Sequence, residues 1–207
     1  MVAGDPQPSQ NGKLISAQGK VVLVVGGGDT GSDCVGTAIR QGANEVHQWE
    51  VLPQPPETRN PVTPWPMWPQ ILRTSSSQEE GCQRRWSVLT KRIGGVETRA
   101  TEVCACEVQW SRGRKGWEFK EQPNSEFSLK ADLILLAMGF VHVQQEGIVE
   151  QLGLELDPQG NIAAKDYMTS LPGVFAAGDA VRGASLVVHA IYAGRQAAAA
   201  MHRWLTR

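Results

Sequence analysis

Short apolar runs and segments of helical periodicity alternate along the first third of the chain. Residues 20–25 form a short apolar run that leads directly into three glycines. Such a run, bounded by a turn signal, is typical of a strand buried on both faces of a parallel sheet. Residues 132–137 form a second run of this kind and predict a second buried strand.

The segment after the three glycines predicts a helix and then another strand. Over residues 29–41 the apolar positions share one helical face, and Gly42 stands where a helix C-terminus would end. Residues 46–51 then alternate as a half-buried strand. The order is thus strand, glycine loop, helix and strand within about thirty residues. This context makes a dinucleotide-binding motif more specific than the glycine pattern alone.

A proline-rich stretch at residues 53–69 follows and contains Trp65 and Trp68. Proline excludes regular helix and central strand here. Because the stretch is too aromatic for a simple linker, we expect an ordered surface insertion. A proline-rich segment that binds a partner is the alternative interpretation.

Strand-like patterns return at residues 87–90 and 95–110. A turn at residues 111–116 then joins the longer strand to residues 117–120. This order predicts a β-hairpin that decorates the parallel sheet.

The last third predicts short elements and one long helix. We expect a short helix at residues 148–152, a short strand at 174–177 and an alanine-rich helix at 185–204. Together the elements predict an α/β fold with a Rossmann-like nucleotide-binding domain, a central parallel sheet and a β-hairpin decoration.

The expected organisation is a lead-in or linker at residues 1–19, a nucleotide-binding domain at 20–140 and a C-terminal segment at 141–207. The first segment is rich in proline and glycine and poor in apolar residues, which favours a linker.

The glycine loop has the residues that a pyrophosphate needs. Gly26 permits a tight turn, Gly28 lets the backbone approach the phosphates, and Gly31 lets the helix pack closely on the strand. The helix N-terminus then offers free amides and a partial positive charge. A glycine-rich turn without a ligand is the alternative.

Glu50 is the candidate for the acidic residue that binds the adenosine ribose about twenty residues further on. A carboxylate at that place repels a 2′-phosphate and favours NADH over NADPH. Arg59 lies nearby in sequence and could accept a phosphate, so the preference is mild; a solvated charge at a strand end is the other interpretation of Glu50.

A second ligand-binding pattern ends the predicted strand at residues 174–177. Gly178 allows a close approach of a ligand, and Asp179 can accept a hydrogen bond from a ribityl hydroxyl of a flavin. The helix that begins near Ser185 could direct its N-terminal amides at the flavin ring. A helix-capping aspartate is the alternative for Asp179.

Composition narrows the class of protein. The chain has 207 residues, a net charge of −1 and 41% hydrophobic residues, so nothing indicates nucleic-acid binding or disorder. No apolar run reaches the roughly 20 residues of a membrane span, and the first residues lack the pattern of a signal peptide. We therefore expect a cytoplasmic protein that is not bound to a membrane.

Nothing in the sequence indicates a metal site. Cys34, Cys82, Cys104 and Cys106 include no Cys-x-x-Cys pair, and we expect ordinary reduced cysteines. A metal or cluster role for Cys104 and Cys106 is the alternative. The nicotinamide nucleotide motif and the flavin motif together predict hydride transfer between the two cofactors. No catalytic acid, base or nucleophile is expected, because this reaction needs only the alignment of two cofactor rings.

Several blocks, in this order, closely resemble the small (beta) subunit of glutamate synthase. The similarity extends over almost everything from Ile15 to Leu205, and its blocks are residues 26–37, 86–91, 131–140, 168–179, 182–183, 185–188 and 194–198.

The resemblance implies a flavoprotein that takes hydride from NAD(P)H onto FAD. Electrons would pass through iron–sulfur clusters to a large subunit that makes glutamate from glutamine and 2-oxoglutarate. The positions that match the family's cofactor motifs are, for the nicotinamide nucleotide, Gly26, Gly28, Asp29, Thr30 and Gly31 and, for the flavin, Gly178, Asp179, Ser185, Leu186 and Val187. Gly139 falls where the family's chain returns from the nucleotide domain to the flavin domain.

The family also has an N-terminal region with cluster cysteines and a first flavin loop, and neither is found here. The chain therefore resembles a C-terminal portion of such a subunit, and we expect weak FAD binding by this chain alone. The expected partner is the large subunit or a separate N-terminal half that carries the FAD loop and the clusters.

Two other functions stay open. The first is a related flavin reductase that delivers electrons to ferredoxin or another acceptor. The second is a truncated dinucleotide-binding module that is inactive without its FAD-binding half. An exposed apolar surface at residues 174–175 and 185–188 would favour the second.

Overall fold

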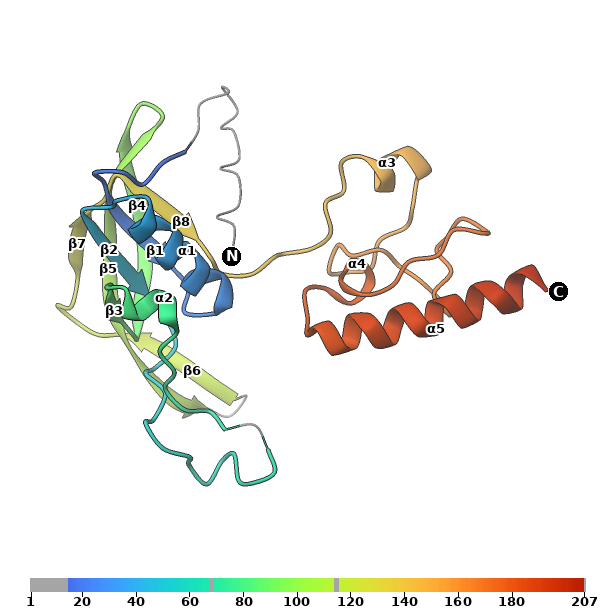
Figure 1. The fold of residues 1–207 in the computed structure, drawn as a ribbon, viewed down its shortest axis with the longest axis horizontal. Coiled ribbons are helices and arrows are strands. Elements are labelled where there is room, and N and C mark those ends of the chain that lie inside the picture. Colours follow the sequence, from blue (N-terminus) through green and yellow to red (C-terminus); the bar gives the residue numbers. More distant parts are fainter. Residues whose placement is uncertain (1–14, 68, 114–115, 207) are drawn as a thin grey trace. The chain divides into compact units, whose positions relative to one another are not determined.

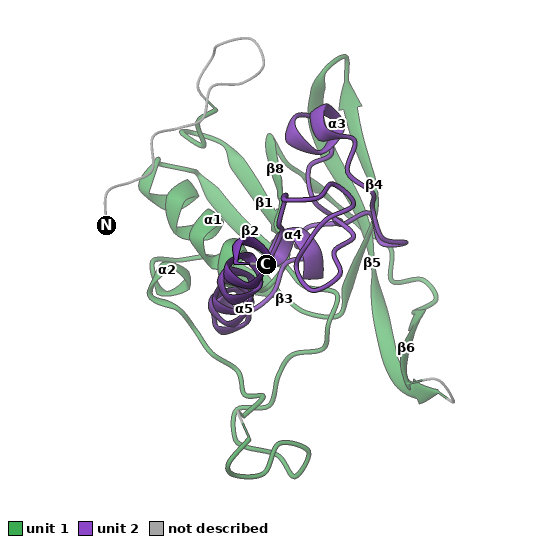
Figure 2. Ribbon diagram, turned by 90° about the vertical axis from the view of Figure 1, so that its right-hand side faces the viewer, with its two compact units in different colours: residues 1–138 green, residues 139–207 purple. Residues whose placement is uncertain are grey.

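The chain folds into two compact units, Met1–Met138 and Gly139–Arg207. Figure 2 colours the two units separately. The computed structural model describes residues 15–67, 69–113 and 116–206. Most of the predicted lead-in, residues 1–14, lies outside the described residues.

A four-stranded parallel sheet organises the first unit. Its strands are β1 (Val21–Val25), β2 (Glu45–Trp49), β3 (Gln83–Arg85) and β8 (Leu133–Leu136), in the order β3-β2-β1-β8 (Figure 1). The chain moves outward from β1 through β2 to β3 and then returns to the other side of β1. The strand order thus reverses between β1 and β8, where open α/β sheets place their ligands.

Strand β1 is buried on both faces, as its continuous apolar run predicts. Val22 and Val24 pack with helix α1 (Asp29–Arg40) on one face. Leu23 and Val25 point the opposite way and join a core that includes residues of the antiparallel sheet. The period of two along a strand explains this division.

The antiparallel sheet forms from the chain between β3 and β8. Its strands are β4 (Val88–Val96), β5 (Arg99–Gly113), β6 (Gly116–Glu121) and β7 (Phe127–Lys130). β5 pairs with all three others, and its pairing with β6 confirms the predicted hairpin. The centre of the predicted turn, residues 114–115, lies outside the described residues.

The proline-rich insertion is held together by its own polar contacts. Arg59 donates from Nη1 to the carbonyl oxygens of Thr63 and Met67, each at 2.8 Å. Asn60 Oδ1 accepts from the backbone of Val62 and from both the backbone and the hydroxyl of Thr63. These contacts agree with an ordered insertion; Trp68 lies outside the described residues.

The second unit is built from helices and irregular chain. Its helices are α3 (Ile148–Leu152), α4 (Asp179–Arg182) and α5 (Val187–Leu205), and Val149, Leu154 and Ile162 form a small core. The short helix at 148–152 is confirmed.

Two predictions for this unit are wrong, one for a strand and one for the start of a helix. Residues 174–177 form no strand, because only an isolated bridge joins Phe175 to Met168 and no strand among the described residues extends it. The long helix begins at Val187, because Leu186 is extended and acts as its N-cap. Among the helices of the described residues, none combines the length and apolar character needed to cross a membrane.

Candidate functional site

The glycine loop lies at the carboxyl end of β1, where the strand order reverses. Gly26 has a φ of +125°, and a Cβ there would lie 2.2 Å from the carbonyl oxygen of Ala137. A Cβ on Gly31 would lie 2.2 Å from the carbonyl oxygen of Gly26. Both neighbours are backbone atoms, so both positions require glycine, as the sequence predicts for a tight turn and for close packing of helix on strand.

Gly28, unlike Gly26 and Gly31, is not sterically required to be glycine. Its φ of −79° suits any residue, and a Cβ would meet nothing within 4 Å. Gly28 is the N-cap of α1 and has no side chain to accept from the first-turn amides. Asp29 and Thr30, both exposed, begin the helix. The loop thus leaves open space at an uncapped helix N-terminus, which is a favourable arrangement for an anion.

Glu50 follows β2 directly and holds the glycine loop. Its Oε2 accepts from the backbone N–H of Gly27 at 2.6 Å, and its Oε1 accepts from that of Leu52 at 3.0 Å. The contact of Glu50 with a ribose stays a prediction. Arg59, the alternative phosphate ligand, is engaged with carbonyl oxygens of its own insertion.

The structure adds Gln48 to the site, which sequence reasoning missed. Gln48 is only 2% exposed, and its Nε2 donates to the carbonyl oxygen of Gly26 at 2.9 Å. Its Oε1 accepts from Nε2 of Gln78 at 2.8 Å. The available signal was a polar residue within a predicted sheet strand, since such a group needs partners when it is buried.

A narrow recess lies between the glycine loop and the ends of β2 and β3. It is lined by Gly27, Gln48, Glu50, Arg84, Arg85 and Trp86. The Arg84 guanidinium lies over the Trp86 ring, 4.7 Å from its centroid, and partial burial lowers the pKa of Arg84. Arg84 also donates from Nη1 to the carbonyl oxygen of Arg73 at 3.2 Å, and Arg85 is paired with Glu107 at 3.1 Å.

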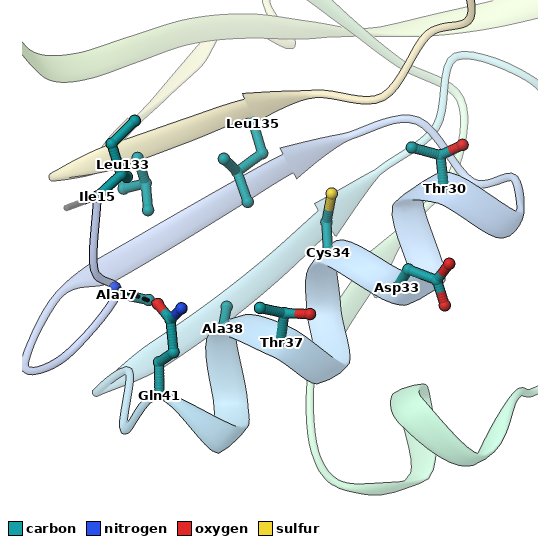
Figure 3. A pocket seen from close by; sticks show the side chains of 10 residues that line it. All are labelled: Ile15, Ala17, Thr30, Asp33, Cys34, Thr37, Ala38, Gln41, Leu133 and Leu135. Atoms are coloured by element: carbon teal, nitrogen blue, oxygen red, sulfur yellow. Dashed lines mark hydrogen bonds between the residues drawn. The ribbon is translucent and has the colours of Figure 1, made fainter. Parts of the chain in front are cut away.

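A hollow of about 300 Å³ lies along α1, on the face of the sheet that the helix covers (Figure 3). Thr30 and Cys34 on α1 face Leu133 and Leu135 of β8 across it. Burial, followed by the charge of Asp33, raises the pKa of the Cys34 thiol. Cys34 is therefore a thiol at neutral pH and a poor nucleophile.

The flavin-side residues of the second unit fall into two hollows. Gly178, with a φ of +68°, and Ser185 line one of about 190 Å³ together with His189 and Tyr192. Asp179 lines another of about 220 Å³, and its Oδ1 accepts from the Ser185 hydroxyl at 3.3 Å.

The remaining predicted residues of this unit line neither hollow. Leu186 and Val187 are exposed, at 67% and 74%. Gly139 opens the unit with a φ of +87°, which favours glycine. His189 was not predicted as a site residue, yet its Nδ1 is buried with no hydrogen-bond partner among the described residues.

No group of three or more histidine, cysteine or acidic side chains that could hold a metal ion occurs within the part of the chain that the structure describes. All four cysteines are free thiols.

The sequence model of the pyridine nucleotide-disulphide oxidoreductases matches residues 5–194. The chain therefore belongs to the pyridine nucleotide-disulphide oxidoreductase family.

Within this class, the chain is similar to glutamate synthases. The glutamate synthase [NADPH] small chain of Mycobacterium tuberculosis (strain H37Rv) is 47% identical over 98% of this chain and 41% of that protein. The glutamate synthase [NADH] of Schizosaccharomyces pombe is 40% identical over 91% of this chain and 9% of that protein. The chain spans less than half the length of these curated relatives.

Solved structures of low sequence identity share the fold. FprA of M. tuberculosis, as a His57Gln mutant, superimposes with a TM-score of 0.66 at 12% identity and covers 92% of this chain and 54% of that one. Thioredoxin reductase of T. acidophilum gives a TM-score of 0.59 at 19% identity with the same coverage. These similarities confirm the predicted α/β fold.

Proposed function

We propose that this chain binds NAD(P)H at the glycine loop and serves in an NAD(P)H-oxidising flavoprotein of the glutamate synthase small-chain type. The observation that carries the proposal is the loop itself. Gly26 and Gly31 are sterically required, while Gly28 leaves open space in front of an uncapped helix N-terminus. A glycine at position 28 leaves room for a ligand, because the protein places nothing against it.

The residues present fit a nicotinamide dinucleotide. The amides of Asp29, Thr30 and Gly31 would hold the pyrophosphate, since anions bind at helix N-termini. Glu50 would accept from the adenosine ribose, and Arg84 and Arg85 line the same recess. The relatives' printed names include both NADPH and NADH, so both cofactors belong in the first test.

The second unit fits one side of a flavin. Gly178 and Ser185 would contact it, and Asp179 would accept from a ribityl hydroxyl. A hollow of about 190 Å³ is too small for a whole flavin, so other residues must complete the site. FAD, when bound, supplies the hydride chemistry, and this chain's residues contribute binding and alignment.

The wider reaction is also a proposal, supported by the names of the relatives. Electrons would pass through iron–sulfur clusters to a large subunit that forms glutamate from glutamine and 2-oxoglutarate. We place the clusters elsewhere in the assembly, because the described residues include no group of three or more side chains that could hold a metal ion. A dinucleotide-binding module that needs a separate FAD-binding half is the second candidate, favoured by the exposure of Leu186 and Val187.

We expect the purified chain to bind NADH or NADPH with micromolar to millimolar affinity and to retain little FAD. A fluorescence titration with each nucleotide measures the first property. The visible spectrum after FAD and then anaerobic NADH are added measures the second. Absence of binding by both nucleotides would contradict the proposal, and a tightly held flavin that bleaches with NADH would show a complete reductase.

A further inference from the structure

One peptide group of the glycine loop is held at both ends by side chains of the neighbouring strand. The carbonyl of Gly26 and the N–H of Gly27 belong to the same planar peptide. Gln48 donates to that carbonyl at 2.9 Å, and Glu50 accepts from that N–H at 2.6 Å. The two side chains can act together because they are two residues apart on the chain and thus lie on one face.

This peptide needs such support because it joins two glycines. Glycine tolerates conformations that other residues avoid, so a peptide between two glycines rotates at little steric cost. If it turned over, the carbonyl of Gly26 would exchange places with the N–H of Gly27. The direction of the following backbone, up to the N-terminus of α1, would change with it.

Gln48 is itself held in one orientation. Its Oε1 accepts from Gln78, and Gln78 Oε1 accepts from the N–H of Ser75 at 2.9 Å in a capping box. Reversing the amide of Gln48 would set oxygen against the Gly26 carbonyl and nitrogen against the Gln78 amide nitrogen. The network therefore fixes Gln48 as a donor toward the loop.

Burial of two amide side chains is costly, and an apolar residue would fill the same space. Gln48 is 2% exposed and Gln78 is 6% exposed. We propose that Gln48 is a positioning residue for the dinucleotide: with Glu50 it clamps the Gly26–Gly27 peptide so that the loop is preorganised for the pyrophosphate. This inference rests on the proposed NAD(P)H site.

The test compares Gln48→Met with Gln78→Met in the full chain. Both variants break the same buried amide–amide bond, so both should lower the Tm. Only Gln48→Met releases the Gly26 carbonyl, and we expect it to raise the Kd for NADH about tenfold, against about threefold or less for Gln78→Met. Equal losses of affinity in the two variants would overturn the clamp.

Amide hydrogen exchange of Gly27, followed by NMR, distinguishes the clamp from a general loss of stability. A general loss would speed exchange in both variants. We expect slow exchange in the wild-type chain and in Gln78→Met, and faster exchange in Gln48→Met. If Gln48→Met does not fold, rapid exchange of Gly27 in the wild type would still refute the clamp. Failure of the wild type to bind either nucleotide would instead refute the proposed function on which the clamp depends.

Discussion

Replacing Gly31 by alanine is expected to destabilise the first unit by about 1–3 kcal/mol or more, because overpacking against backbone costs that much. The new Cβ would lie 2.2 Å from the carbonyl oxygen of Gly26 and 2.8 Å from Nε2 of Gln48. Neither neighbour can move freely. The first belongs to the loop peptide, and the second is buried and bonded to Gln78. Urea denaturation followed by circular dichroism measures the loss.

Gly28→Ala is the matched control, since it makes the same change three residues earlier. Its Cβ would meet nothing within 4 Å, and the φ of −79° at Gly28 suits alanine. The control should stay within about 1 kcal/mol of the wild type, because alanine restricts the unfolded chain but is less favourable than glycine at an N-cap. Equal stability of Gly31→Ala and Gly28→Ala would contradict the close packing of α1 on the loop.

The buried parts of the fold were predictable from periodicity. The run at β1 and the amphipathic pattern of α1 reflect burial on two faces and on one. The run at β8 predicted the strand but not its burial, because β8 is the edge strand, is only half-buried and leaves Leu136 exposed. Strand β3 left no such signal. It has three residues, Gln83, Arg84 and Arg85, and it is a strand because β2 offers it an edge to pair with. Tertiary pairing of this kind has no counterpart in local propensity.

The candidate site was predictable to the extent that backbone geometry dictates residue type. Gly26 and Gly31 need glycine for steric reasons that a sequence motif records. The role of Gln48 depends instead on Gln78, thirty positions away in the chain, and on the carbonyl of Gly26. Such contacts are visible only once the fold has brought the strand, the loop and α2 (Ser76–Glu79) together.

The same reason explains the error at residues 174–177. Val174 and Phe175 have strand propensity, but a strand needs a neighbour along its whole length. Here Met168 pairs with Phe175 in a single bridge, and Ala176 donates to the carbonyl of Tyr167. The segment therefore ends at Gly178 as irregular chain, and the hollow that His189 and Tyr192 share with Gly178 arises from contacts between distant residues.

Gly28→Ala should also lose the nucleotide while it keeps the fold. The methyl group would project into the open space before the N-terminus of α1, where we place the pyrophosphate. A methyl at van der Waals distance would push the phosphates away from the helix amides and weaken charge-assisted hydrogen bonds. We expect the Kd for NADH to rise about 30-fold or more, which corresponds to about 2 kcal/mol.

A paired measurement separates this effect from a general defect. Titration with NADH reports affinity, and thermal unfolding without nucleotide reports the fold. The expected pattern is a wild-type Tm with weak binding, together with loss of the rise in Tm that NADH gives the wild-type chain. Tight binding by Gly28→Ala would mean that no ligand approaches this glycine, and the dinucleotide site would have to lie elsewhere. Because the fold has room for a methyl group at position 28, a large loss of affinity with little loss of Tm would point to the ligand.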